Sequence, residues 1–298
     1  GRGAVHRFAL DGAAAAAVRS LAQEEGATPF MALLAAFHLL LARWSGGRDV
    51  VVGTPVAGRV RPELEGLVGF FVNSLPLRAE LGGDPTFRQL LVRSREATLA
   101  AFAHQDLPFD RLVEELRIER GLAHTPVFQV MLVLQNTAPG TFELPGVEVE
   151  PVEVETGTSK CDLILSVTED GDGFRAALEY DADLFETGSV RRLAERFETL
   201  LRGIASGPDL PAFALPLMDA AERARVLEEW NATHRPYPRD ASIHRLFETQ
   251  AARTPGAAAL EHEGGTLTYA ELNRAANRLA HGLRRRGVGP EARVALLM

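Results

Sequence analysis

The sequence has very little lysine and cysteine, and these shortages exclude several kinds of protein. Lys160 is the only lysine among 32 basic residues, and the formal net charge is −8. Without a basic tract the chain is a poor partner for nucleic acid, because binding there depends on neutralising phosphates. Cys161 is the only cysteine, which excludes intrachain disulfides and a cysteine-rich metal site, so a reducing, cytoplasmic compartment is expected.

Long hydrophobic runs are missing too. The longest, residues 30–42, is interrupted by His38 and is too short to span a bilayer, which takes roughly 20 residues. We therefore expect no membrane partner. With 298 residues, 46% of them hydrophobic and 24% charged, the chain suits one large domain or two smaller ones. It starts on Gly1 and stops inside an expected strand, so we expect a piece of a longer protein.

Common catalytic motifs are also absent from the sequence. It contains no HExxH, no GxSxG, no Walker loop, no GxGxxG before a helix and no metal-ligand spacing. Function must therefore be sought in single polar residues placed by the fold.

Hydrophobic spacing predicts an α/β fold followed by a second domain. Helices are expected after caps at Asp11 and Thr28, from residues 84–86 onward, and over residues 109–116 and 189–204. Strands are expected at residues 7–10, 50–52, 67–76, 127–134, 147–154, 161–167 and 173–180. The run at 127–134 is apolar at nearly every position, which predicts a central strand covered on both faces. Residues 206–219 carry three prolines and predict a linker.

Residues 50–78 hold the main candidate site. A β-branched run at 50–52 leads through a Gly-Thr-Pro break to Arg59, and an apolar stretch at 67–72 leads to Asn73. Arg59 suits a carboxylate partner, or it is a solvated loop residue. Asn73 suits a substrate amide or an active-site loop, or it makes a structural hydrogen bond to the backbone.

Other polar candidates favour structural roles. His38 lies on an apolar helix, where a packed histidine is the usual finding. His104 and Asp106 are too close together on a turn to form a catalytic pair. Cys161 follows Lys160, which would lower a thiol pKa, yet a packed thiol fits better. His124 begins the strand at 127–134 without a partner in the sequence.

Five motifs occur together in an order typical of one family. They are VGFFVNSLPLR at 68–78, AHQDLPFDRLVEEL at 103–116, HTPVFQVMLVLQN at 124–136, SKCDLILSV at 159–167 and LEYDADLFE at 178–186. They resemble the condensation domains of nonribosomal peptide synthetases. WNAT at 230–233 and residues 266–288 resemble the linker and opening of an adenylation domain. Cys161 departs from the family, which usually has an aromatic residue there.

The resemblance implies a fold and a division of the chain. Residues 1–205 would form the C-terminal lobe of a condensation domain, a chloramphenicol-acetyltransferase-like mixed sheet with helices. Residues 206–235 would be a linker, and residues 236–298 the first α/β elements of an acyl-adenylate-forming domain. In this family an acceptor amine attacks a donor thioester, both carried on phosphopantetheine arms of peptidyl carrier domains, in a tunnel between two lobes.

The resemblance also limits what this chain does alone. The family's HHxxxDG motif belongs to the other lobe, and the sequence contains no His-His pair. We therefore expect no catalytic residue and no bound cofactor in this chain, whereas the longer parent would use ATP and magnesium. Arg59 resembles the arginine that pairs with the aspartate of HHxxxDG, and Asn73 resembles an asparagine near the tunnel. The other lobe and the remaining adenylation domain are expected partners.

Three alternatives stay open at this point. The lobe would be a non-catalytic platform that docks carrier or neighbouring domains, or a cyclization or epimerization variant of the same fold. A stand-alone CoA-dependent acyltransferase fits least, since it would not run into an adenylation domain. An exposed apolar face is expected where a second lobe would pack.

Overall fold

The structure, a computed structural model, separates into two compact units, Gly1–Glu229 and Trp230–Met298. It describes residues 1–59, 61–117, 125–135, 156–262 and 264–297. Among these residues no single helix has the length and apolar composition to cross a membrane; only the bent pair Gly12–Glu24 and Pro29–Ser45 meets that criterion jointly.

The first unit is built on one six-stranded sheet in the order β1-β6-β5-β4-β2-β3. Its strands are β1 (Gly3–Leu10), β2 (Asp49–Val56), β3 (Asn73–Glu80), β4 (Val130–Gln135), β5 (Leu163–Asp170) and β6 (Gly173–Asp181). Strand β4 runs parallel to β2 and β5, and the other neighbouring pairs are antiparallel. The mixed sheet confirms the predicted α/β class. The strands expected at 161–167 and 173–180 read as a hairpin pair in the sequence, and the antiparallel pair of β5 and β6 confirms it.

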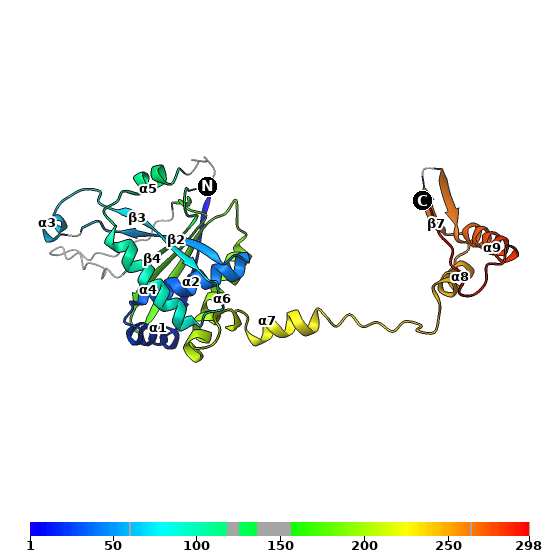
Figure 1. Ribbon diagram of the computed structural model, residues 1–298, viewed down its shortest axis with the longest axis horizontal. Helices are drawn as coiled ribbons and strands as arrows, with labels where there is room; N and C mark the ends of the chain where they lie inside the picture. Colours follow the sequence, from blue (N-terminus) through cyan, green and yellow to red (C-terminus); the bar gives the residue numbers. More distant parts are fainter. Residues whose placement is uncertain (60, 118–124, 136–155, 263, 298) are drawn as a thin grey trace, which may run out of the picture. The chain divides into compact units, whose positions relative to one another are not determined.

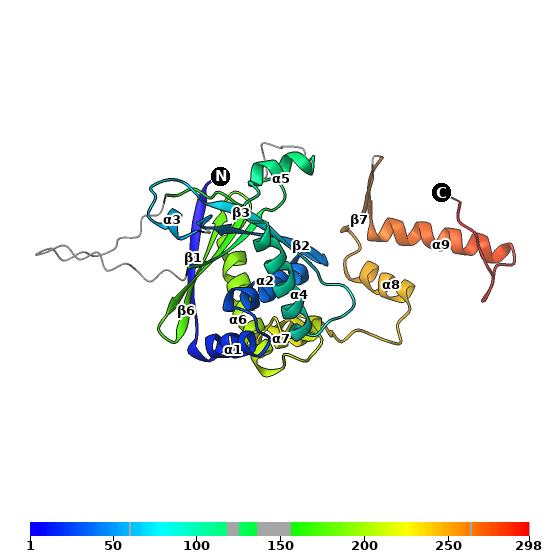
Figure 2. The same cartoon turned by 60° about the vertical axis from the view of Figure 1, so that its left-hand side comes forward.

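Helices α1 (Gly12–Glu24), α2 (Pro29–Ser45), α4 (Phe87–Ala103) and α6 (Thr187–Ser206) cover one face of the sheet (Figures 1 and 2). The shorter helices of this unit are α3 (Pro62–Glu65), α5 (Phe109–Glu115), η1 (Ala212–Ala214), α7 (Ala220–Ala224) and η2 (Arg225–Glu229). In β5 the side chains of Leu163, Leu165 and Val167 are buried, whereas the residues between them are less so. This alternation is typical of a sheet whose second face is less covered.

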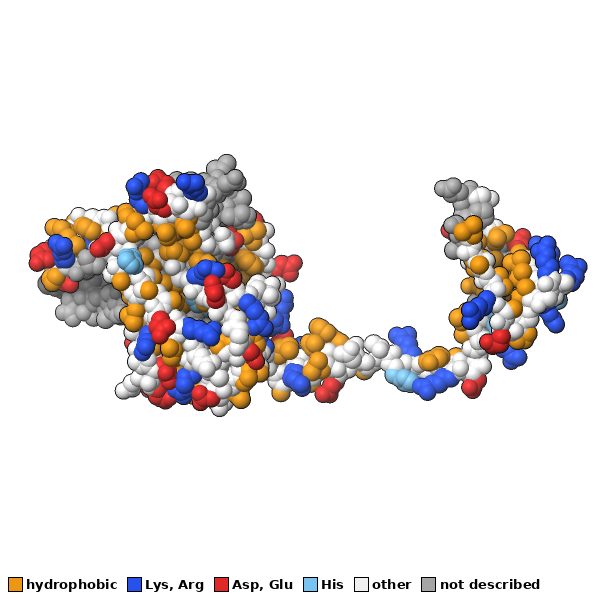
Figure 3. Space-filling view, viewed as in Figure 1, with side chains coloured by type: hydrophobic (Ala, Val, Ile, Leu, Met, Phe, Trp, Pro, Cys, Tyr) orange, Lys and Arg blue, Asp and Glu red, His pale blue; other side chains and the backbone are white. Residues whose placement is uncertain are grey.

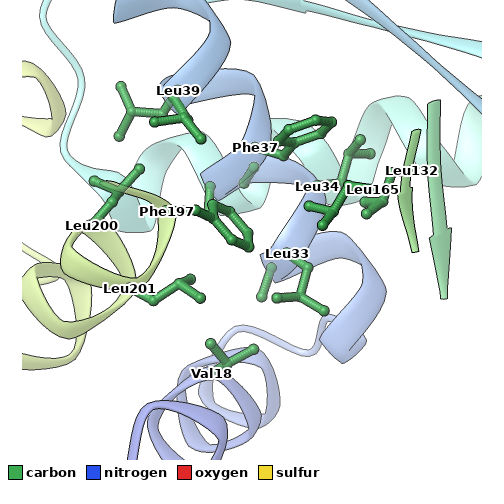
Figure 4. Packing of buried hydrophobic residues seen from close by; sticks show 14 of the residues in the cluster. Val18, Leu33, Leu34, Phe37, Leu39, Leu132, Leu165, Phe197, Leu200 and Leu201 are labelled. Carbon is green, nitrogen blue, oxygen red and sulfur yellow. The ribbon is translucent and has the colours of Figure 1, made fainter. Parts of the chain in front are cut away.

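Helix α2 runs through the core, as its hydrophobic spacing predicts. The Thr28 hydroxyl accepts the Met31 N–H at its start, and Gly46 ends it in the left-handed conformation, with φ of 75°. The ring of Phe37 meets the ring of Phe197 on α6 edge-on, with centroids 6.0 Å apart (Figure 4). Burial of this wide apolar arc, rather than helix propensity, supplies most of the stabilisation.

Two expected strands differ from the structure. Residues 67–72 form no strand, because pairing with β2 begins only at Asn73. Strand β4 begins at Val130, and Leu132 is its only fully buried residue, so the prediction of a strand covered on both faces is wrong. The strand expected at 147–154 lies outside the described residues.

The segment after α6 packs onto the first unit. Ala212 and Leu215 lie in its hydrophobic core, and the guanidinium of Arg43 donates to the carbonyl oxygen of Leu215. Arg88 pairs with Asp209 at 3.0 Å and also with Glu25. These contacts attach residues that the sequence marks as a linker to the first unit.

For the second unit the sequence predicts helices at 242–252 and 269–286 and a strand at 257–262, and the structure has all three and one further short strand. Its elements are α8 (Ile243–Arg253), β7 (Ala258–His262), β8 (Gly265–Thr268) and α9 (Tyr269–Arg285). Strands β7 and β8 are antiparallel, and Thr268 caps α9 together with Glu271. Residues 292–297, expected as a strand, form none among the described residues.

Candidate functional site

The loop between β2 and β3 carries the site that the sequence singles out. Val56 pairs with Asn73, so the two ends of the loop at 57–72 lie side by side on neighbouring strands. Gly58 has a φ of +65°, and a Cβ atom there would lie 2.0 Å from the carbonyl oxygen of Phe71. Glycine is therefore required where the outgoing and returning parts of the loop meet.

Arg59 follows Gly58 and contacts other residues of the same loop. Its guanidinium donates to the carbonyl oxygens of Leu64 and, at 2.8 Å, of Leu67, and its Cζ lies 4.4 Å from the centroid of the Phe71 ring. A planar group with five donors can make all these contacts at once. The structure thus gives Arg59 local partners, and its pairing with a carboxylate of another lobe stays a prediction.

The same loop exposes large apolar side chains. Val68 and Phe70 are almost fully exposed, and Leu67 and Val72 are about half exposed. Figure 3 shows hydrophobic side chains gathered over this side of the first unit, between α3 and α5. Exposed apolar groups that lie together on a surface are typical of a contact surface. We call residues 67–72 the apolar loop.

Asn73 uses its whole side-chain amide on backbone groups. Its Nδ2 donates to the carbonyl oxygens of Gln105 and Leu107, both at 2.8 Å, and its Oδ1 accepts the N–H of Phe109 at 3.1 Å. Both donor hydrogens and the acceptor are therefore occupied. Of the roles considered for Asn73, the structural hydrogen bond to the backbone fits this geometry. The side chain connects β3 to the turn between α4 and α5.

A tilted contact between two aromatic rings connects this turn to the sheet. The ring centroids of Phe109 and Phe128 lie 5.3 Å apart. The ring of Phe128 lies against Gly53 of β2, where a Cβ atom would come within 2.3 Å of it. Sequence reasoning missed Gly53, Phe109 and Phe128, although a glycine inside a β-branched strand is a signal of close approach.

The remaining candidates do not form a catalytic group. His104 and Asp106 are exposed, and in the described part of the chain no hydrogen bond or ion pair joins them. Cys161 is buried, and burial raises the pKa of its thiol, which fits a packed side chain. His124 lies outside the described residues. The described residues contain no group of three His, Cys, Asp or Glu that could hold a metal.

His38 is buried, as expected for a core histidine. Its Nε2 lies 3.0 Å from the carbonyl oxygen of Leu77, and burial lowers its pKa from 6.5 to about 4. The ring is therefore neutral near pH 7.

Comparison with known proteins places these features in a family. Residues 2–227 match the family described as Condensation domain, and this stretch contains the whole six-stranded sheet. The chain belongs to the condensation domain family. Residues 247–298 match the family described as AMP-binding enzyme, and this matched stretch begins within α8.

Relatives of this condensation domain chain are large synthases. One linear gramicidin synthase protein of Brevibacillus parabrevis is 48% identical over 296 residues, which are 99% of this chain and 6% of that protein. Tyrocidine synthase 3 of the same organism is 43% identical over 290 residues, which are 97% of this chain and 4% of that protein. The chain thus spans only a small part of the relatives it matches.

Two solved structures are similar to this chain. Holo-AB3403, a four-domain nonribosomal peptide synthetase, matches 96% of this chain at a TM-score of 0.79, and the match covers 23% of the holo-AB3403 chain. The two sequences are 22% identical, so this similarity is one of fold. The X-domain from teicoplanin biosynthesis is 32% identical at a TM-score of 0.67, and the match covers 73% of this chain and 50% of the X-domain chain.

Proposed function

We propose that the first unit is one lobe of a two-lobe condensation domain in a nonribosomal peptide synthetase. The acceptor amine attacks the carbonyl carbon of the donor thioester. A C–N bond forms, the C–S bond breaks, and the amine proton ends on the released thiol. Both substrates are carried on phosphopantetheine arms of peptidyl carrier domains, in a cytoplasmic enzyme. The other lobe supplies HHxxxDG.

The condensation-domain match over residues 2–227 carries this proposal. The X-domain comparison supports it, because the matched part corresponds to half of that chain. Arg59 and Asn73 act as positioning residues: the first holds the loop, and the second holds the turn before α5. The second unit begins the adenylating domain that activates an amino acid with ATP and magnesium.

The test compares this chain with its parent protein. Each is mixed with carrier domains loaded with donor and acceptor amino acids, and dipeptidyl thioester is measured by mass spectrometry. We expect product from the parent only, and no ATP–pyrophosphate exchange from this chain. Dipeptidyl product from this chain alone would contradict the need for a second lobe, and exchange would contradict the assignment of its second unit as incomplete.

A docking lobe without catalysis is the second candidate. The exposed side chains of Val68 and Phe70 favour it, and the teicoplanin X-domain, one of the similar structures, is known in a complex with OxyB. If the parent binds loaded carriers but forms no product, the docking role replaces the catalytic one.

A further inference from the structure

A cavity lies beside the edge strand of the sheet, on the side where α4 packs against α2 and β3 (Figure 2). Its volume is about 280 Å³, and the apolar residues Leu34, Leu77 and Leu90 belong to its wall. The wall also includes Arg93 and Ala97, which are exposed, so the cavity opens to solvent along α4. A cavity of about 150 Å³ already takes up benzene, so there is room here for one substituted ring.

Arg93 places a cation at this opening. Its Nη1 donates to the carbonyl oxygen of Gly82 at 3.3 Å, and Gly82 directly follows Leu81, another residue of the wall. The guanidinium therefore lies at the end of the cavity that Leu81 lines. In the part of the chain that the structure describes, no ion pair involves Arg93. A neutral carbonyl oxygen does not compensate its charge, and most of its N–H donors are left for a ligand.

The other two charged residues of the wall, Arg78 and Glu80, pair with each other at 2.9 Å. Arg78 also holds both carboxylate oxygens of Asp49, at 2.9 and 2.8 Å. Among the described residues neither carboxylate forms an ion pair with Arg93. Arg93 is therefore the charged group of the wall whose partner a ligand can supply.

We propose that this cavity binds a small aromatic carboxylate, with the ring in its apolar part and the carboxylate on the guanidinium of Arg93. The ring replaces water against Leu34, Leu77 and Leu90. The carboxylate stays at the opening, where it keeps part of its hydration and a planar guanidinium can donate to both of its oxygens. The site uses α2, α4 and the edge of β3, and it does not depend on the condensation function.

The first measurement compares 4-methylbenzoate with 4-methylbenzamide, which has nearly the same shape but no charge. Binding to the full chain is followed by ligand-observed NMR and calorimetry. We expect the carboxylate to bind about threefold tighter at low ionic strength, the size of effect that a partly exposed ion pair supplies. High salt should remove this preference, because it screens exposed charges. Equal affinities at low ionic strength, or no binding of either compound, would overturn the proposal.

A pair of charge variants tests the role of Arg93. Arg93→Gln keeps the apolar wall but removes the cation, so 4-methylbenzoate should bind no tighter than 4-methylbenzamide. Arg191→Gln is the matched control, because Arg191 lies on α6, outside the cavity wall, and pairs with Glu195. It should keep the threefold preference. Both arginines are exposed, so both variants should fold. A preference that survives in Arg93→Gln would overturn the proposal.

A second pair of variants locates the ring. Ala97→Leu adds bulk at the rim of the cavity on α4 and should weaken binding of both compounds at least threefold. Ala100→Leu, exposed on α4 but outside the cavity wall, should leave both affinities unchanged. Equal affinities of the two variants for 4-methylbenzoate would place the ring outside this cavity and overturn the proposal.

Discussion

The side-chain oxygen of Asn73 accepts the backbone N–H of Phe109 at 3.1 Å, which joins the first residue of β3 to the first residue of α5. The same amide donates to Gln105 and Leu107, so one side chain fixes the turn between α4 and α5. The ring of Phe109 in turn contacts the ring of Phe128, which lies against Gly53. Asn73 therefore couples the end of the loop at 57–72 to the sheet through α5.

Replacing Asn73 by alanine should destabilise the first unit by about 1–2 kcal/mol. Three hydrogen bonds are lost, two of them partly buried, and the backbone groups at 105, 107 and 109 lose this partner. Urea unfolding, followed by Trp44 fluorescence in a Trp230→Phe background, measures the change. Asn277→Ala, on an exposed face of α9, is the matched control and should stay within about 0.5 kcal/mol. If Asn73→Ala and Asn277→Ala lose the same free energy of unfolding, Asn73 does not stabilise the turn between α4 and α5.

Arg59→Lys should loosen the apolar loop. An ammonium group cannot donate to both carbonyl oxygens and also stack on Phe71 as the planar guanidinium does. Loss of about 1 kcal/mol of local stability should speed chymotrypsin cleavage at Phe70 or Phe71 about fivefold. Arg61→Lys, exposed on the same loop, should cleave at the wild-type rate. If Arg59→Lys lowers the free energy of unfolding of the whole unit but leaves the rate of loop cleavage unchanged, Arg59 does not stabilise the loop locally.

Gly58→Ala should destabilise by about 2 kcal/mol or more. Alanine must take the left-handed conformation, and its Cβ would come within 2.0 Å of the Phe71 carbonyl oxygen. Gly66→Ala is the matched control, because its φ of −82° suits any residue and a Cβ there meets nothing within 4 Å. Urea unfolding of both variants checks this, and a tolerated Gly58→Ala would show that the loop does not need the close approach.

Lowering the pH should destabilise the first unit through His38. Burial lowers the pKa of His38 from 6.5 to about 4, so the unfolded chain binds the proton first as the pH falls. Stability due to this group is complete above pH 6.5 and is lost between pH 6.5 and 4, by about 3 kcal/mol in all. Between pH 6.5 and 4 the free energy of unfolding should fall less steeply with decreasing pH in His38→Phe than in wild type. His104→Gln, at an exposed site, should keep the wild-type slope.

Local signals in the sequence predicted most of the elements correctly. Asp11 and Thr28 each accept a backbone N–H at a helix start, as predicted. Side-chain capping and hydrophobic spacing act within a few residues, so they can be read without the fold. Residues 67–72 show the limit of this method. An apolar run alone cannot distinguish a buried strand from an exposed loop, because the difference depends on whether a neighbouring strand pairs with it.

The sequence by itself determined the α/β class, the family and the two residues, Arg59 and Asn73, around which a site was sought. Only the tertiary structure decided what these residues contact: carbonyl oxygens and a ring for Arg59, and the turn at 105–109 for Asn73. It also placed His38 beside a cavity at the edge of β3. The physical reason is that hydrogen-bond partners far apart along the chain are brought together by packing, which local patterns do not encode.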